Sequence, residues 1–143
     1  MLYAPKPNPS CTVFFSNLID GWNTAVYNYA RLFKKEIYQI GFTVNKKSDK
    51  SPAYFFVNYN YNDKDEFIQR VVHLIKDNRW VFYENSEEVK PLSIEKTEYY
   101  TLKRKTERLN NTIILEYMKK AGFDLSDSDF FETNGPVFYC DWN

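Results

Sequence analysis

The stretch YFFVNYNYNDKDEFIQRVVHLIKDNRWVFYE, Tyr54–Glu84, decides the fold of this chain. In its first part, up to Tyr61, positions alternate at a period of two, which is the pattern of a β-strand with two distinct faces. One face carries Phe55, Val57, Tyr59 and Tyr61, and the other carries Asn58 and Asn60. We therefore expect one buried face and one face in water.

The second part of the stretch predicts a β-hairpin. Two apolar segments, Phe67–Lys76 and Trp80–Glu84, flank Asp77 and Asn78, and both of these residue types tolerate the positive φ of a tight turn. Upstream, Tyr38–Val44 alternates with the same period. Residues 37 to 84 therefore predict an antiparallel meander.

Helical periodicity lies on both sides of this meander. After Asp20, an apolar stripe at helical spacing predicts a helix, and it consists of Trp22, Ala25, Val26, Tyr29, Ala30 and Phe33. Downstream, Ser93–Leu109 and Ile113–Ala121 have helical spacing, with candidate caps in Asn110-Asn111-Thr112 and Gly122 as a stop, so a helical pair is expected.

The two ends of the chain have weaker patterns. Residues 1 to 10 contain three prolines and predict an extended arm, and the β-rich run Thr12–Phe15 predicts a short strand. Val137–Tyr139 also looks strand-like.

Together these patterns predict a single α+β domain over residues 1–143, a length typical of one domain. We expect a mostly antiparallel sheet of about five strands, one N-terminal helix and a C-terminal helical pair. The expected core residues are Trp22, Val26, Tyr29, Ile40, Phe42, Val57, Val72, Leu74, Phe82, Leu102, Ile114 and Met118.

Composition narrows the class of protein. Hydrophobic residues make up 43% of the chain and charged residues 27%, as in ordinary globular domains. No run approaches the ~20 apolar residues that span a bilayer, and MLYAPKPNPS lacks the apolar core of a signal peptide. We expect a cytoplasmic protein without membrane contact. Nineteen basic and nineteen acidic residues leave no net field for a polyanion, so a nucleic-acid partner is not expected.

Residues for catalysis or metal binding are sparse. The one histidine, His73, lies between Val72 and Leu74 in a predicted strand, where a structural role is expected. Cys11, Cys140 and His73 are too few ligands for a structural zinc site. Paired terminal segments would bring the two thiols close, but in a reducing cytoplasm free thiols are expected. No phosphate loop or nucleophile elbow is present. We expect no catalytic residue, metal or cofactor.

The acidic end of the chain is the candidate binding surface. Residues 124 to 143 contain five acids and no Lys or Arg, interleaved with large aromatic rings. Carboxylates around aromatic side chains are suited to binding a basic protein. Alternatively, the segment is a solvated acidic loop whose aromatic side chains point inward. The candidate contact residues are Asp124, Asp127, Asp129, Phe131, Glu132, Tyr139, Asp141 and Trp142.

A second charged segment has the opposite sign. Lys96 to Arg108 contains five bases and two acids, which could follow a phosphate backbone. An exposed face of an amphipathic helix explains the same residues.

The organisation of the whole chain resembles small bacterial immunity proteins from toxin-immunity systems, and FFSNLIDGW (Phe14–Trp22) and RWVFYENSE (Arg79–Glu87) look like segments of bacterial proteins. The resemblance implies a cytoplasmic α+β inhibitor that blocks a partner toxin or enzyme. The alternative is a small-molecule-binding domain or enzyme with a pocket between sheet and helices.

Overall fold

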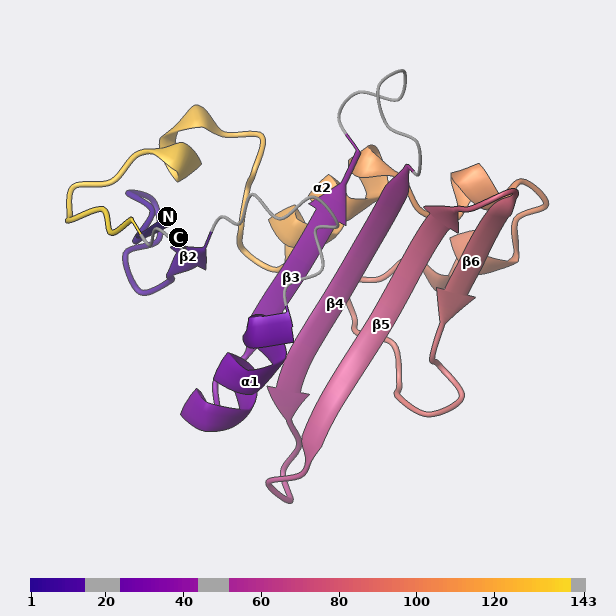
Figure 1. Cartoon of the computed structure of the whole chain (residues 1–143), viewed down its shortest axis with the longest axis horizontal. Helices are drawn as coiled ribbons and strands as arrows, with labels where there is room; N and C mark the ends of the chain where they lie inside the picture. The colour runs from indigo at the N-terminus through magenta and orange to yellow at the C-terminus, as the bar shows by residue number, and fades with distance from the viewer. Residues whose placement is uncertain (15–23, 44–51, 140–143) are drawn as a thin grey trace. The chain divides into compact units, whose positions relative to one another are not determined.

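A four-stranded antiparallel sheet dominates the computed structural model (Figure 1), which describes residues 1–14, 24–43 and 52–139. Its strands are β3 (Ile37–Phe42), β4 (Ala53–Tyr61), β5 (Phe67–Lys76) and β6 (Trp80–Glu84), and they pair in chain order. The predicted meander and the α+β class are confirmed. The chain divides into two compact units, Met1–Gly21 with Leu115–Asn143, and Trp22–Ile114. We call these unit 1 and unit 2.

The turn between β5 and β6 differs from the predicted geometry. Lys76 pairs with Trp80, so three residues connect β5 to β6. Neither Asp77 nor Asn78 has a positive φ, so the predicted tight turn is wrong, because a longer connection does not require it. The left-handed residue is Asp65, in the turn between β4 and β5, with φ of 61°.

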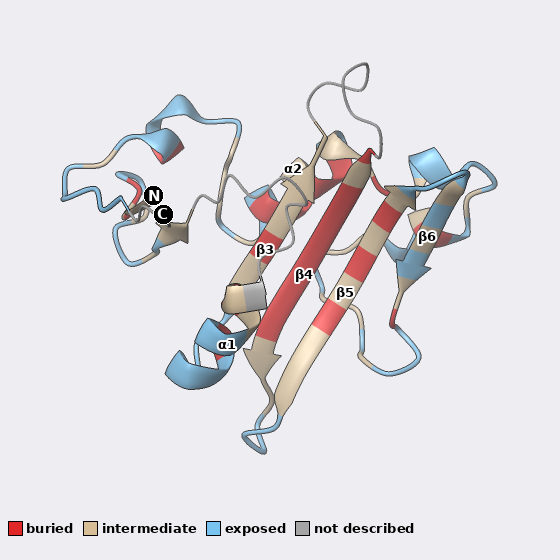
Figure 2. Ribbon diagram, viewed as in Figure 1, coloured by how far each residue is buried: buried red, intermediate tan, exposed pale blue. Residues whose placement is uncertain are grey.

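β4 is buried on both faces, which contradicts the predicted wet face (Figure 2). Phe55, Val57 and Tyr59 are buried on one side. Tyr54, Phe56 and Asn58 are buried on the other. The chain that follows β6 passes behind the sheet in Figure 1 and covers this second face. The sequence of a strand that is covered on both faces is nearly continuously apolar, as it is at Tyr54–Val57.

Helix α1 (Thr24–Phe33) covers the first face of the sheet. Val26 and Ala30 form a buried cluster with Phe55, Val57 and Tyr59. The helix therefore buries a narrower stripe than its sequence predicts.

Tyr29, by contrast, is exposed, so its predicted core position is wrong. The predicted core residue Trp22 lies outside the described residues.

The first of the two predicted C-terminal helices does not form. Ser93–Leu109 contains only two 3₁₀ turns, η1 (Thr97–Thr101) and η2 (Lys105–Glu107), with non-helical backbone at Leu102 and Arg104. The second predicted helix is confirmed as α2 (Asn111–Lys120), which spans the boundary between the units.

The predicted caps of α2 are confirmed as well. The Asn110 side chain accepts a hydrogen bond from the Ile113 backbone N–H at 3.1 Å. Gly122 ends the helix with φ of 92°, a conformation that glycine adopts without a steric penalty.

The remaining core predictions are mostly correct. Half-buried positions occur near the edges of the sheet and in the 3₁₀ segment, where one side of each side chain remains in water. The buried set is Val26, Val57, Val72, Leu74, Ile114 and Met118, and the half-buried set is Ile40, Phe42, Phe82 and Leu102.

A buried ionic cluster fixes the chain against the second face of the sheet. The Arg70 guanidinium is fully buried and donates to both carboxylate oxygens of Glu95, with a shortest distance of 2.7 Å from Nη2. Its Nη1 donates to Glu84 at 2.8 Å and to the Asn85 side-chain oxygen at 3.1 Å. Tyr100 donates its hydroxyl to Glu95 at 2.7 Å.

The electrostatics of this cluster favour its ionised form. Burial by itself would lower the pKa of Arg70, but the hydrogen bonds and charge of Glu95, followed by Glu84, outweigh it and raise that pKa. A buried charge is tolerated only with such partners. The cluster therefore requires Glu95 to face inward, where its carboxylate also accepts from the Leu92 N–H at 2.8 Å.

Removing the Glu95 carboxylate should show how much a buried Arg70 charge without its main counterion destabilises the fold. We expect Glu95→Leu to lower the free energy of unfolding by about 3–5 kcal/mol, because it leaves Arg70 without its main counterion. The double variant Arg70→Met/Glu95→Leu should recover most of that loss. Urea unfolding measures both, and Arg104→Met, which removes an exposed ion pair with Glu107, should change little.

Glu84 should make stability depend on pH. Burial alone would raise its pKa, but hydrogen bonds from Ser86 and Arg70 outweigh burial and hold the pKa below its ordinary value of 4.5. A lowered pKa contributes stability above the unfolded value, and this contribution is lost as pH falls through the folded value. The stability difference between wild type and Glu84→Gln should therefore shrink on acidification from about pH 6 to about pH 3. A constant difference in urea midpoint would contradict this.

Gly41 should not tolerate a side chain. The Phe55 ring lies over it on the neighbouring strand, and an added Cβ would stand 2.2 Å from Phe55 Cε1. We expect Gly41→Ala to cost about 1–3 kcal/mol of unfolding free energy through overpacking. In the Phe55→Leu background the same change should cost less. Gly135→Ala, whose Cβ would lie 3.6 Å from Thr133 Oγ1, is the matched control without a clash.

Candidate functional site

The N-terminal segment positions the acidic end of the chain within unit 1. β1 (Leu2–Tyr3) pairs with β2 (Val13–Phe14), and Leu2 also forms an antiparallel bridge with Phe138. The predicted extended arm over residues 1–10 is therefore wrong in part, because its first residues form a strand. The strand predicted at Thr12–Phe15 is present as β2, and Phe15 lies outside the described residues.

Two further contacts hold the acidic segment against this strand pair. Tyr3 is buried and donates its hydroxyl to the Phe130 carbonyl at 3.2 Å. The Lys6 backbone N–H donates to the Glu132 carbonyl at 2.7 Å. Residues that are far apart in sequence thus share one small scaffold.

Lys6 draws two of the predicted contact carboxylates together. Its Nζ lies 3.3 Å from Glu132 Oε2 and 3.9 Å from Asp129 Oδ2. The hydrogen bond to Glu132, with the charge of Asp129, raises the pKa of Lys6. No pattern near Lys6 predicts this pairing, since it follows from the fold of unit 1.

The other two described acids stabilise local turns. Asp124 accepts from Lys119 Nζ at 2.6 Å and from the Ser126 N–H at 3.1 Å, and the Lys119 hydrogen bond, before the Ser126 one, lowers its pKa. Asp127 accepts from the Asp129 N–H at 3.0 Å and so caps η3 (Ser128–Phe131). Hydrogen bonds to Glu132 and Asp124 raise the pKa values of Lys6 and Lys119, and the charge of Asp127 adds a smaller increase to both.

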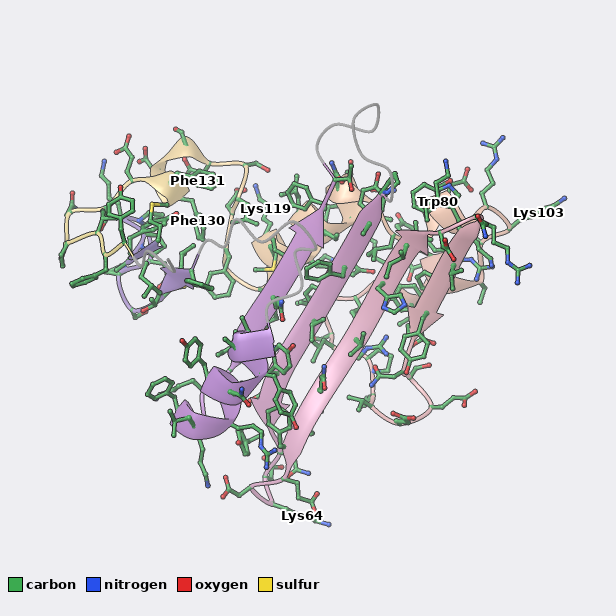
Figure 3. All side chains as sticks on the ribbon, viewed as in Figure 1. Lys64, Trp80, Lys103, Lys119, Phe130 and Phe131 are labelled. Atoms are coloured by element: carbon green, nitrogen blue, oxygen red, sulfur yellow. The ribbon has the colours of Figure 1, made fainter. Side chains whose placement is uncertain are left out.

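Large apolar side chains lie exposed on the same segment. Figure 3 labels Phe130 and Phe131, which are neighbours in η3 with ring centroids 5.7 Å apart and near-perpendicular planes. Phe130 is buried, whereas Phe131 is 50% exposed. Tyr139 is 79% exposed, and Val137 and Phe138 are exposed as well.

The predicted contact residues therefore divide into two groups. Those that the structure describes all belong to unit 1 and keep water-accessible side chains, and they are Asp124, Asp127, Asp129, Phe131, Glu132 and Tyr139. Asp141 and Trp142 lie outside the described residues, as does Cys140. Phe138 is one of the aromatic rings of the acidic segment, although it is not among the predicted contact residues. We call the six described residues together with Phe138 the acidic aromatic surface.

The two units carry opposite net charges, although the whole chain has a net charge of zero. By sequence, unit 1 contains seven acidic and three basic residues, a net charge of −4. Unit 2 contains the remaining twelve acidic and sixteen basic residues, a net charge of +4. Unit 1 alone thus has the field to attract a basic partner.

The basic segment of unit 2 is only partly free. Arg108 donates its Nε to the Leu102 carbonyl at 2.7 Å and lies over the Phe82 ring. Lys96 lies over the Tyr99 ring. Lys103–Lys105 is exposed, and Figure 3 shows Lys103 extending away from the ribbon.

Groups suited to catalysis do not converge in the described parts of the chain. His73 lies in β5 as predicted and shares a sheet face with Val71 and Ile75, and its ring lies 5.2 Å from that of Tyr83. Burial lowers the pKa of His73. Cys11 is a free thiol whose pKa burial raises. Within residues 1–14, 24–43 and 52–139, no three His, Cys, Asp or Glu residues are placed to hold a metal ion.

Comparison with known proteins gives no relative for this chain: no family model, curated protein or solved structure matches it. The helices that the structure describes include none with the length and apolar character needed to cross a membrane.

Proposed function

We propose that this protein is a non-catalytic binding protein that blocks a basic partner, a toxin or an enzyme, through the acidic aromatic surface of unit 1. The observation that carries the proposal is the exposure of Phe131 and Tyr139 on a segment whose carboxylates are already held in place. The immunity-type organisation of the sequence supports the same role in the bacterial cytoplasm.

The two kinds of side chain would do different work. Carboxylates on a unit of net charge −4 speed the encounter with a positive partner, since long-range attraction acts before contact. Rings lose water only on contact, so they contribute mainly to how slowly the complex dissociates. Tyr139, as an exposed ring with a polar tip, is the residue type most enriched at binding hot spots, along with Trp and Arg.

Preorganisation supports binding by the acids. Asp127 and Asp124 accept backbone N–H groups, and Lys6 and Lys119 restrict Glu132 and Asp124. Side chains that are ordered before binding lose less conformational entropy when the partner arrives. The two lysines also reduce the local negative charge, so a partner must compete with them.

The alternative, a ligand-binding or catalytic pocket between sheet and helices, remains without a specific supporting observation. The densest polar cluster described in unit 2 is that of Arg70, and its groups satisfy one another. Such an arrangement stabilises structure and leaves little capacity for a ligand.

Once affinity capture from the source organism and mass spectrometry have identified a partner, its kinetics test the proposal. Asp129→Lys/Glu132→Lys should slow association, and more at low salt than at high salt, because screening weakens long-range attraction. Tyr139→Ala should chiefly raise the dissociation rate. Surface plasmon resonance at two ionic strengths measures both rates.

Control variants define which result would exclude the proposal. Lys103→Glu/Lys105→Glu reverses two exposed charges on unit 2 and should not slow association. Lys6→Met should speed association at low salt, because it removes a competing cation. An association rate that is unchanged by the Asp129/Glu132 reversal at low ionic strength would exclude this surface. Far-UV circular dichroism confirms that each variant is folded.

A further inference from the structure

The positive charge of unit 2 is concentrated in two short segments. By sequence, residues 76–80 and 102–108 together contain six basic residues and two acidic ones, Asp77 and Glu107, which gives a net charge of +4. The rest of unit 2 contains ten of each, so its net charge is zero. The expectation of no nucleic-acid partner rests on the zero net charge of the whole chain, and that average does not describe this region.

The fold brings the two segments to one end of the sheet. Lys76 pairs with Trp80 where β5 connects to β6, and Arg79 lies in that connection. η2 lies close to β6, which places residues 102–108 beside the same strand. In Figure 3, Trp80 and Lys103 are at the same end of the sheet. We call this cluster the basic end of unit 2, and it consists of Lys76, Arg79, Lys103, Arg104 and Lys105.

Most cations of the basic end are available to an external anion. All five side chains are exposed. Arg104 forms an exposed ion pair with Glu107 at 3.5 Å. Lys34 of the same unit is likewise paired, with Asp65. The cations of the basic end that form no ion pair with any residue that the structure describes are Lys76, Arg79, Lys103 and Lys105.

The side chains of the basic end fit a phosphate backbone better than a protein or a membrane. Three of the five cations are lysines, and lysine is depleted at protein–protein interfaces. Within residues 76–80 and 102–108 no apolar side chain is exposed, since Trp80 and Leu102 are half-buried. The apolar face that strengthens binding to a membrane surface is therefore absent from these segments. Lys and Arg side chains are, by contrast, the main donors to nucleic-acid phosphates.

We propose that the basic end of unit 2 binds the phosphate backbone of a nucleic acid without reading its sequence. Contacts to phosphate carry no direct information about the bases, so this binding depends on charge alone. Each cation that neutralises a phosphate releases a condensed counterion, which makes the affinity fall steeply as salt is added. The basic end shares no residue with the acidic aromatic surface of unit 1.

Fluorescence anisotropy of a labelled single-stranded oligothymidylate, titrated with the full chain, tests this proposal. We expect a dissociation constant of about 1–100 µM at physiological salt, the range of non-specific binding. The logarithm of the association constant should fall with the logarithm of salt concentration with a slope of about −3, because each of the four unpaired cations contributes about −0.7 on a single strand. An oligonucleotide of mixed sequence without self-complementarity should bind equally well.

Charge-removing variants locate the binding site. Lys103→Gln/Lys105→Gln should weaken binding about tenfold or more at low salt and change the slope to about −1.5, because two of the four unpaired charges are lost. Arg79→Gln, on the other segment, should reduce the steepness of the slope by about 0.7. Lys35→Gln/Lys64→Gln is the matched control, since both lysines are exposed and Lys64 lies at the other end of the sheet in Figure 3. This control removes the same net charge and should leave the slope unchanged.

Four results would overturn the proposal. The first is the absence of saturable binding at low salt, and the second is a slope that Lys103→Gln/Lys105→Gln leaves unchanged while far-UV circular dichroism shows a folded chain. The third is an equal loss of affinity in Lys35→Gln/Lys64→Gln, which would assign binding to net charge alone. The fourth is binding of poly-glutamate or phosphatidylserine vesicles that is as tight and depends on the same lysines, which would assign the basic end to an acidic protein or a membrane. None of these results bears on the acidic aromatic surface, so the two proposals fail separately.

Discussion

Burial of the Arg70 guanidinium is the constraint on which the architecture of unit 2 depends. A charge in the interior requires opposite charge and hydrogen bonds within contact distance. Glu84 on β6 supplies part of this from the neighbouring strand, but Glu95 must come from the segment beyond it. The chain after β6 lies across the sheet with Glu95 against Arg70, and then turns through η1 and η2. The ionic cluster thus selects one path for the chain, whatever its net contribution to stability.

That path explains where the many aromatic rings go. The chain has 12 Tyr, 12 Phe and 3 Trp, and a sheet covered on both faces has room for more of them than a sheet with one wet face. Tyr54 stacks on Trp80 and Phe82 contacts Tyr100 on the Arg70 side, while Tyr27 packs edge-on against Phe67 beneath α1. Among residues 1–14, 24–43 and 52–139, the exposed rings lie mainly on α1 and on the acidic end of the chain.

The two units differ in the charged and aromatic side chains that they present to other molecules. Unit 1 concentrates negative charge around exposed rings, a pattern suited to a basic partner. In unit 2, Lys34 beside α1 pairs with Asp65, and Arg31 of α1 lies over the Tyr27 ring. A chain of zero net charge can therefore combine one unit of net charge −4 with another of net charge +4.

Local periodicity in the sequence by itself determined the strands between Ile37 and Glu84, helix α1 and helix α2, because alternation and caps act between neighbours in the chain. It also predicted six acidic and aromatic residues that the structure keeps at the surface of unit 1. Only the tertiary structure decided that Tyr54 and Phe56 are buried, that Ser93–Leu109 is not a helix, and that Lys6 neutralises Glu132. These features depend on which distant segment covers a face or supplies a counterion, and such pairings leave no period in the sequence. The sequence could have predicted that Arg70 needs a carboxylate partner, because it shares one strand face with Val72 and Leu74. The identity of that partner, Glu95, was set by the fold alone.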